Sequence, residues 1–445
     1  MTIRIRPVTL VRRLAAGFLM TACGTEGSPG AFRAAATIEP ILPTVTQDSG
    51  VLVMEHGPDA LDRAPRLVVD SAPVMTVGGA EGDPQYDLTR VSFAVPLTDG
   101  RFMAFSRIGN LVMLFGRDGR GERIFGRTGK GPGDWMSFGD PRRLAGDTLL
   151  IIDFGNQRLN WLTADQGVVR TAPLTLSGAM NRLGSVAGFL PGGEAIMHSA
   201  GSWGGHQTDS LNRSLATVVA LSPATSSART IVTLPDLIGV EFETNYRGRK
   251  AMDWRPLRLS GTALVAVWDS SIATTSATDT RIDLRGADGA VLSRIVLLRP
   301  ARAVTDAMRA SRVELELARL SAPGMERAVD PGESRRIARE APFADSLPGF
   351  SSLATAPDGT LWAVDAIAPS DSTWSATAFR KDGAIVGRLH VRGRSTPMAF
   401  GDGRVIVRTE DEDGVVALLV LAIRFASGEP WESDQSRRVP LPPPS

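Results

Sequence analysis

Short apolar runs separated by tight-turn residues form the dominant pattern of the chain, and they are clearest over Val91–Trp135. Asp-Gly and Gly-Asn pairs supply the positive φ angles that two-residue hairpins need, so this stretch predicts a four-stranded antiparallel meander. A single meander leaves one apolar face and two sheet edges open, and it therefore needs further copies of itself. The turns that separate its runs are Asp99-Gly100, Gly109-Asn110 and Asp118-Gly119.

The rest of the chain supplies these copies, each as a turn followed by an apolar strand. Three intervals between copies, of 47, 46 and 44 residues, match a propeller blade, whereas the other two, of 69 and 97 residues, require insertions. The sixth copy lacks a fourth strand, and the spare apolar segment Pro73–Gly78 can fill that vacancy beside Gly414–Phe425. The pattern predicts an all-β, six-bladed β-propeller of four-stranded antiparallel blades closed by an N-terminal strand. The copies begin at Phe102, Leu149, Ala195, Leu264, Leu361 and Val405.

Two motifs carry a resemblance to a known repeat class. Ile152–Leu159 resembles the Asp-x-x-Asn-x-Arg turn of NHL repeats, and Phe125–Trp135 is similar to the linker of bacterial six-bladed β-propeller lipoproteins of the NHL/TolB-like class. The general pattern covers roughly residues 66–425, but the sharp motifs cover only the first two blades. The resemblance implies a propeller exported to the cell envelope, in a family whose members mostly lack an assigned activity.

The polar residues of the first motif allow two interpretations. Asp153 can accept backbone N–H groups across the turn, with Asn156 in the left-handed region and Arg158 paired back to the aspartate. The same three residues could instead form a ligand-facing cluster near the mouth of the central channel.

The N-terminal residues resemble an export signal. Residues 1–22 combine arginines, a short apolar run and small residues before Cys23. Leu19-Met-Thr-Ala-Cys23 resembles a bacterial lipobox, which implies cleavage before Cys23 and acylation that holds the protein on a membrane. A simple secretory signal is the alternative. Gly24 is not the Asp associated with inner-membrane retention, so we expect anchoring in the envelope at the outer membrane or facing the periplasm.

Composition defines the remaining segments and narrows the function classes. Residues 23–65 are rich in small residues and Pro and predict a flexible tether before the folded region 66–425, and residues 426–445 form a Pro-rich tail. A net charge of +1 gives no reason to expect a nucleic-acid partner. A phosphate loop is disfavoured because Gly131 and Pro132, not Ser or Thr and a helix, follow Lys130. Ser202, within Gly-Ser-Trp-Gly, likewise lacks the helix of a nucleophile elbow.

Meander geometry places every long segment on one face of the propeller, which we call the long-loop face. It carries the turns between second and third strands and the linkers between blades; the opposite face, with the other turns, is the turn face. Long loops on a rigid scaffold commonly carry function, although a free surface also tolerates insertions. The long segments are His198–Arg213, Pro235–Trp254, Asp269–Asp279, Pro300–Pro348 and Asp365–Trp374.

The insertion at 300–348, between blades 4 and 5, is predicted to be helical. Apolar residues recur at helical spacing over Thr305–Leu320, and Asp330, Pro331 and Glu333 form an N-cap signal for a second helix through Ala341. Such a pair could cap the channel mouth or cover one side of a ligand cleft.

These observations favour a membrane-tethered binding module for an envelope protein, peptide or glycan, rather than an enzyme. No catalytic residue and no cofactor are predicted, since the four histidines lack metal-ligand spacing; a divalent metal near His198 and His206 is the alternative. Some NHL-type propellers carry metal-assisted lyase chemistry, so a lyase or hydrolase at the channel mouth is the second hypothesis, and a structural scaffold is the third. The binding residues expected on the long-loop face are His198, Trp203, His206, Tyr246, Arg247, Arg249, Asp153, Asn156 and Arg158.

Overall fold

The computed structural model describes residues 38–79, 86–107, 109–174, 185–199, 213–222, 227–246, 248–276, 278–321, 330–401 and 403–427. The expectations for the export signal, Cys23, Trp203, His206, Arg247 and most of the C-terminal tail lie outside these residues.

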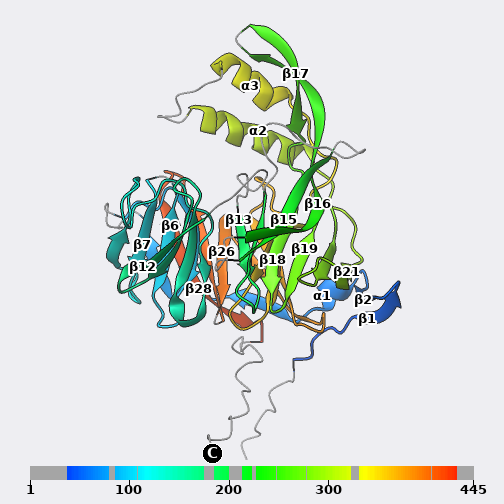
Figure 1. The fold of residues 1–445 in the computed structure, drawn as a ribbon. Coiled ribbons are helices and arrows are strands. Elements are labelled where there is room, and N and C mark those ends of the chain that lie inside the picture. Colours follow the sequence, from blue (N-terminus) through cyan, green and yellow to red (C-terminus); the bar gives the residue numbers. More distant parts are fainter. Residues whose placement is uncertain are drawn as a thin grey trace, which may run out of the picture. The chain divides into compact units, whose positions relative to one another are not determined.

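Four-stranded antiparallel groups make up most of the described chain, an arrangement consistent with a β-propeller (Figure 1). In each group the strands pair in chain order, as the tight turns between them require. The first two groups are β5 (Val91–Pro96), β6 (Phe102–Ser106), β7 (Leu111–Phe115) and β8 (Gly121–Phe125), then β9 (Arg142–Arg143), β10 (Leu149–Asp153), β11 (Arg158–Thr163) and β12 (Gly167–Pro173), with a short 3-10 helix over Ala145–Asp147. The next two are β13 (Ser185–Phe189), β14 (Ala195–His198), β15 (Arg213–Ser222) and β16 (Ser227–Tyr246), then β18 (Leu264–Trp268), β19 (Ser271–Thr275), β20 (Arg281–Arg285) and β21 (Val291–Leu297). The last two are β22 (Phe350–Thr355), β23 (Leu361–Asp365), β24 (Thr373–Phe379) and β25 (Ile385–Arg392), then β26 (Ser395–Gly401), β27 (Arg404–Glu410) and β28 (Val416–Phe425).

An N-terminal strand completes the last group. β4 (Met75–Gly78) pairs antiparallel with β28, so that Met75 lies opposite Val420 and Gly78 opposite Ala417. The predicted pairing of Pro73–Gly78 with Gly414–Phe425 is therefore confirmed. The edge of β28 that would otherwise be open is covered by chain from the other end of the sequence.

Part of the segment predicted as a flexible tether is structured. β1 (Thr44–Asp48) and β2 (Val51–His56) form a hairpin around Ser49-Gly50, which both have positive φ, and α1 (Ala60–Arg63) and β3 (Arg66–Val69) follow. β2 pairs parallel with β21, and β3 lies between β25 and β28. The tether prediction fails over residues 44–63 because outer sheet edges far along the chain supply partners that the local sequence does not reveal.

Apolar side chains fill the spaces between neighbouring groups, since most of these strands are buried on both faces. On β6, Met103 and Phe105 pack toward the second group, whereas Phe102 and Ala104 pack toward the sixth. Four more interfaces follow the same scheme through the described groups. The cluster that contains Phe102 also contains Ile406 of β27. Burial on both faces explains why the strands form short continuous apolar runs.

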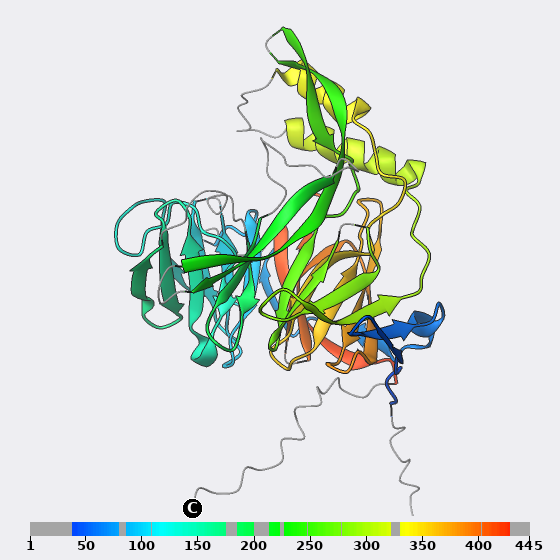
Figure 2. The same cartoon turned by 45° about the vertical axis from the view of Figure 1, so that its right-hand side comes forward.

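The insertions between the third, fourth and fifth groups form one projecting unit, which we call the arm. It consists of the outer part of the hairpin of β16 and β17 (Arg249–Pro256), with α2 (Asp306–Ser321) and α3 (Pro331–Glu340) beside it (Figures 1 and 2). Both predicted helices are confirmed. Asp330 caps α3 by accepting hydrogen bonds from the N–H groups of Gly332 and Glu333. In the described part of the chain, no helix is both long and apolar enough to cross a membrane.

Two predictions about the long segments are wrong. Pro235–Trp254 is not a loop, because β16 continues for 20 residues and pairs with β17 over Gly239–Tyr246. Asp269–Asp279 contains β19, because Asp269 adopts a φ of 57° and turns the chain directly after β18. The fourth copy of the repeat is therefore the first strand of its group, whereas the other copies are second strands.

Candidate functional site

The first strand of every group contributes to one cavity of about 640 Å³. The direction of the strands determines which residues lie at the two ends of this cavity. First strands begin, and second strands end, on the long-loop face. Much of the wall is apolar, with charged side chains near the ends of the strands. Lining residues of β5, β9, β13, β18, β22 and β26 include Phe93, Arg142, Phe189, Val267, Ala354 and Phe400.

A charged cluster lies where this cavity meets the long-loop face, and we call it the channel-mouth cluster: Arg107, Asp140, Arg142 and His198. Arg107 follows β6, and its Nη2 lies 2.7 Å from Asp140 Oδ1. The second carboxylate oxygen of Asp140 lies 3.8 Å from Nη2 of Arg142 at the start of β9. One buried carboxylate thus faces two guanidinium groups, which leaves a net positive charge when His198 is neutral.

Arg142 combines accessibility with an unsatisfied donor. Thirty-five per cent of its side-chain surface is accessible, because it faces the cavity. Burial by the surrounding protein lowers the pKa of Arg142, and the nearby charge of Asp140 opposes this effect. Its buried Nε has no hydrogen-bond partner among the described residues. An anion bound in the cavity would supply the missing counter-charge to the accessible part of this guanidinium group.

His198 ends β14 beside these charges. Burial lowers the pKa of His198; the charge of Asp140 raises it and that of Arg142 lowers it. The imidazole is therefore neutral near pH 7, and its buried Nδ1 lacks a partner within the described chain. A neutral imidazole can donate or accept a hydrogen bond or a proton.

One buried arginine, Arg258, contacts both helices of the arm. Its guanidinium donates hydrogen bonds to the carbonyl groups of Ala338 and Ala341 at the end of α3. It also lies 3.3 Å from Glu316 of α2 and stacks over Phe343, with 3.8 Å between Arg258 Cζ and the ring centroid. Both helices therefore depend on a residue that precedes β18.

The side of α3 that faces the hairpin is held by Glu333. Its Oε1 accepts a hydrogen bond of 2.8 Å from the N–H of Asn245 in β16 and pairs with Arg336 at 2.7 Å. Hydrogen bonds from Arg336 and then from Asn245 lower the pKa of Glu333 to about 2. The predicted capping role of Glu333 is thus replaced by a contact between α3 and the hairpin.

Asp153, Asn156 and Arg158 lie together and hold the linker between the first two groups. Asp153 is 0% exposed and accepts hydrogen bonds from the N–H groups of Met136, Ser137 and Asn156. Arg158 Nε lies 3.5 Å from Asp153, and Arg158 also donates to the carbonyl groups of Gly131 and Asp134. This arrangement is the structural alternative considered for the motif, although the positive φ of 51° falls on Gln157 rather than Asn156.

The remaining expected binding residues occupy two places. His198 belongs to the channel-mouth cluster, whereas Tyr246 and Arg249 are paired at the tip of the β16–β17 hairpin. Sequence reasoning missed Arg107, Asp140 and Arg142. Their positions directly after a second strand or around the start of a first strand could have indicated them, because such positions share the long-loop face. No group of three or more His, Cys, Asp or Glu side chains suited to a metal occurs among the described residues.

Comparisons with known proteins give limited structural likeness. No family model and no curated protein matches the chain. A member of the duf4221 family from Bacteroides vulgatus is 9% identical, with 81% of this chain and 99% of that chain covered and a TM-score of 0.47. A protein from Bacteroides fragilis is 8% identical over 84% of this chain and 99% of its own, with a TM-score of 0.45. Virginiamycin B lyase from Staphylococcus aureus is 7% identical over 80% of this chain and 99% of its own, with a TM-score of 0.38. Likeness at this level assigns no activity to the chain.

Proposed function

We propose that this chain is an exported, lipid-anchored, six-bladed propeller of the NHL/TolB-like class that binds an anionic protein, peptide or glycan segment on its long-loop face. The observation that carries the binding proposal is the channel-mouth cluster, in which two arginines share the single carboxylate of Asp140. A cationic site at the end of a cavity with low-dielectric walls concentrates its field on an entering anion. The arm projects from the same face and can form one side of the binding site.

Six blades are supported by the cores between the groups. Six apolar clusters each join two neighbouring groups, and the one around Phe102 joins the first group to β27 and β28 of the last. First strands of neighbouring groups lie close together at five of the junctions, and Arg143 of β9 donates to the Pro96 carbonyl of β5 at the sixth. A ring of groups that returns to its start packs both faces of every group against a neighbouring group.

Anchoring through Cys23 is part of this proposal, and the described chain begins on the turn face. Ile41, early in the described chain, bridges Ile385 at the start of β25, on the turn face.

Binding to acidic polymers tests the proposal. Poly-L-glutamate and polygalacturonate would serve as acidic peptide and glycan probes, with dextran as the neutral probe, in biolayer interferometry on the purified chain. We expect at least one acidic probe to bind, binding to weaken with salt, and Arg142→Gln to weaken it at least tenfold. Arg120→Gln is the matched control, since it removes the same charge from the turn face. Failure of both acidic probes to bind, or equal binding by Arg142→Gln and wild type, would overturn the proposal.

A lyase or hydrolase at the channel mouth is the second candidate, and the neutral His198 beside the cavity is the observation that favours it. A metal-assisted reaction there would need more ligands than the described residues assemble. Metal analysis of the purified protein, with and without His198→Gln, tests this candidate: bound divalent metal that is lost in the variant supports it, and metal-free protein refutes it.

A further inference from the structure

A second cavity, of about 530 Å³, lies on the turn face between the last and first groups. β4, β27 and β28 form one side, and the turn between β5 and β6 forms the other. Its size falls within the usual range for small-molecule sites. Among the described residues, none of the binding residues predicted for the long-loop face lines this second cavity.

The floor of this turn-face pocket is apolar. Met75, Leu97 and Ile406 line it and are almost completely buried, and Val420 and Phe102 extend the same surface. At its edge, Val74 remains 51% exposed although it is aliphatic. An alkyl chain in this pocket would remove further apolar surface from water.

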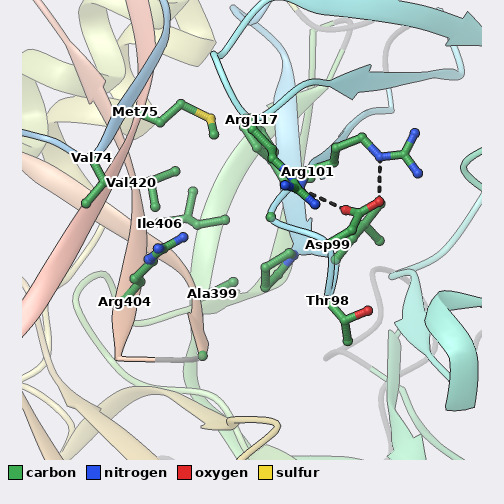
Figure 3. A pocket seen from close by; sticks show the side chains of 15 residues that line it. Val74, Met75, Thr98, Asp99, Arg101, Arg117, Ala399, Arg404, Ile406 and Val420 are labelled. Carbon is green, nitrogen blue, oxygen red and sulfur yellow. Dashed lines mark hydrogen bonds and ion pairs between the residues drawn. The ribbon is translucent and has the colours of Figure 1, made fainter. Parts of the chain in front are cut away.

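Arginines flank the apolar floor on opposite sides. Arg404 lies on the side of Val74, Ile406 and Val420, whereas Arg117 lies on the side of Arg101 and Asp99 (Figure 3). Arg101 is already engaged, because its guanidinium contacts Asp99 at 2.7 Å and Asp165 at 3.1 Å.

The other two cations are less engaged. Within the described chain, neither Arg117 nor Arg404 forms an ion pair with a carboxylate. Among the charged residues that line the pocket, three arginines face the single carboxylate of Asp99. An apolar floor between two available guanidinium groups is complementary to a molecule with one anionic end and one aliphatic end.

We propose that the turn-face pocket binds an aliphatic carboxylate, with the carboxylate between Arg117 and Arg404 and the alkyl chain over Met75, Ile406 and Val420. This site lies on the face opposite the channel-mouth cluster and does not depend on it. It also lies on the turn face, where Ile41 near the start of the described chain bridges Ile385.

A chain-length series of carboxylates tests the pocket. Hexanoate, octanoate and decanoate would be titrated into the purified chain by isothermal titration calorimetry, with acetate as the head group alone and 1-octanol as the tail alone. Burial of each additional CH₂ should strengthen binding about three- to fourfold. Octanoate should bind at least tenfold more tightly than acetate or 1-octanol.

Variants locate the binding. Arg117→Gln/Arg404→Gln should weaken octanoate binding at least tenfold, and Val74→Asp should do the same by placing a like charge at the edge; all three positions are exposed, so the fold should be kept. Arg120→Gln, from the same turn as Arg117 but outside the pocket, is the matched control and should bind as wild type. Arg142→Gln should also leave octanoate binding unchanged, which separates this site from the channel mouth. Equal binding of acetate and decanoate, or wild-type binding by both pocket variants, would overturn the proposal.

Discussion

Replacing Arg258 with methionine should release the arm while leaving the sheets folded. Methionine keeps an apolar stem of similar length but removes the guanidinium group that contacts α3 and Glu316. Each hydrogen bond from a charged donor contributes about 1.5–3 kcal/mol, and two are lost to carbonyl groups at the end of α3. Glu316 keeps Arg312 at 2.6 Å and is not left as an isolated charge.

These contacts determine how much stabilising free energy the arm loses in Arg258→Met. Two charge-assisted hydrogen bonds would cost about 3–6 kcal/mol, and relief from burying the charge of a residue that is only 9% exposed offsets part of this. We therefore expect the free energy of opening the arm to fall by about 3 kcal/mol, which corresponds to a loss of amide protection of about 100-fold.

Hydrogen–deuterium exchange with mass spectrometry measures this loss peptide by peptide. Protection should fall over α2, α3 and the tip of the β16–β17 hairpin, and remain at the wild-type level over β5–β8. Arg319→Met is the matched control, because Arg319 is an exposed arginine on α2. The reasoning is refuted if α3 keeps its protection, or if protection falls equally in β5–β8.

Two further predictions concern buried and paired carboxylates. Asp153→Asn should lower the free energy of unfolding by about 2–4 kcal/mol in urea titrations, because an amide cannot accept all the N–H groups that converge on Asp153. Asp165→Asn is the control, since that carboxylate is 78% exposed, and it should change the free energy of unfolding by less than about 0.5 kcal/mol. Equal effects of the two substitutions would contradict the structural role assigned to Asp153. The pKa of Glu333, lowered to about 2 from an ordinary 4.5, means that its contact with the hairpin contributes stability above pH 4.5 and loses it as the pH falls toward 2. The amide signal of Asn245, followed by NMR in protein labelled with ¹⁵N-asparagine, should therefore shift with a midpoint near pH 2 in wild type and show no such transition in Glu333→Gln; a midpoint near 4.5 would refute the contact.

Features fixed by neighbouring residues could be predicted from the sequence. The strands of the first group follow from tight turns such as Asp99-Gly100, and α3 follows from its cap at Asp330. The pairing of β4 with β28 was also predictable, because the last group lacks a fourth strand of its own and β4 has no neighbouring strand in sequence to pair with.

The arm hairpin could not be predicted, because its sequence contains residues that usually end strands. Pro235 and Gly239 suggest a linker, yet Pro235 sits at a register shift between β15 and β16, where the regular ladder is interrupted. A Cβ at Gly239 would lie 2.2 Å from the Trp254 ring, so the glycine provides the space for that indole. Contacts between distant residues, such as Arg107 with Asp140, are likewise not encoded by any local pattern.

One position in the repeat explains why the NHL-like motif is sharp in only one place. Asp153 ends β10 and Asp365 ends β23, so both close the second strand of their group on the long-loop face. Asp153 binds the incoming linker through the backbone N–H groups of Met136 and Ser137. Asp365 instead binds Arg299, which follows β21, at 2.7 Å.

The same task is thus performed by different partners. Backbone donors require a linker that turns closely around the aspartate, which accounts for the glycines before Trp135. An arginine side chain reaches farther and tolerates a linker of another length, so the connection that carries α2 and α3 could lengthen without loss of its attachment. These two groups share the aspartate but not the full motif, and the use of a side-chain partner in the fifth group is compatible with the long connection that carries the helices of the arm.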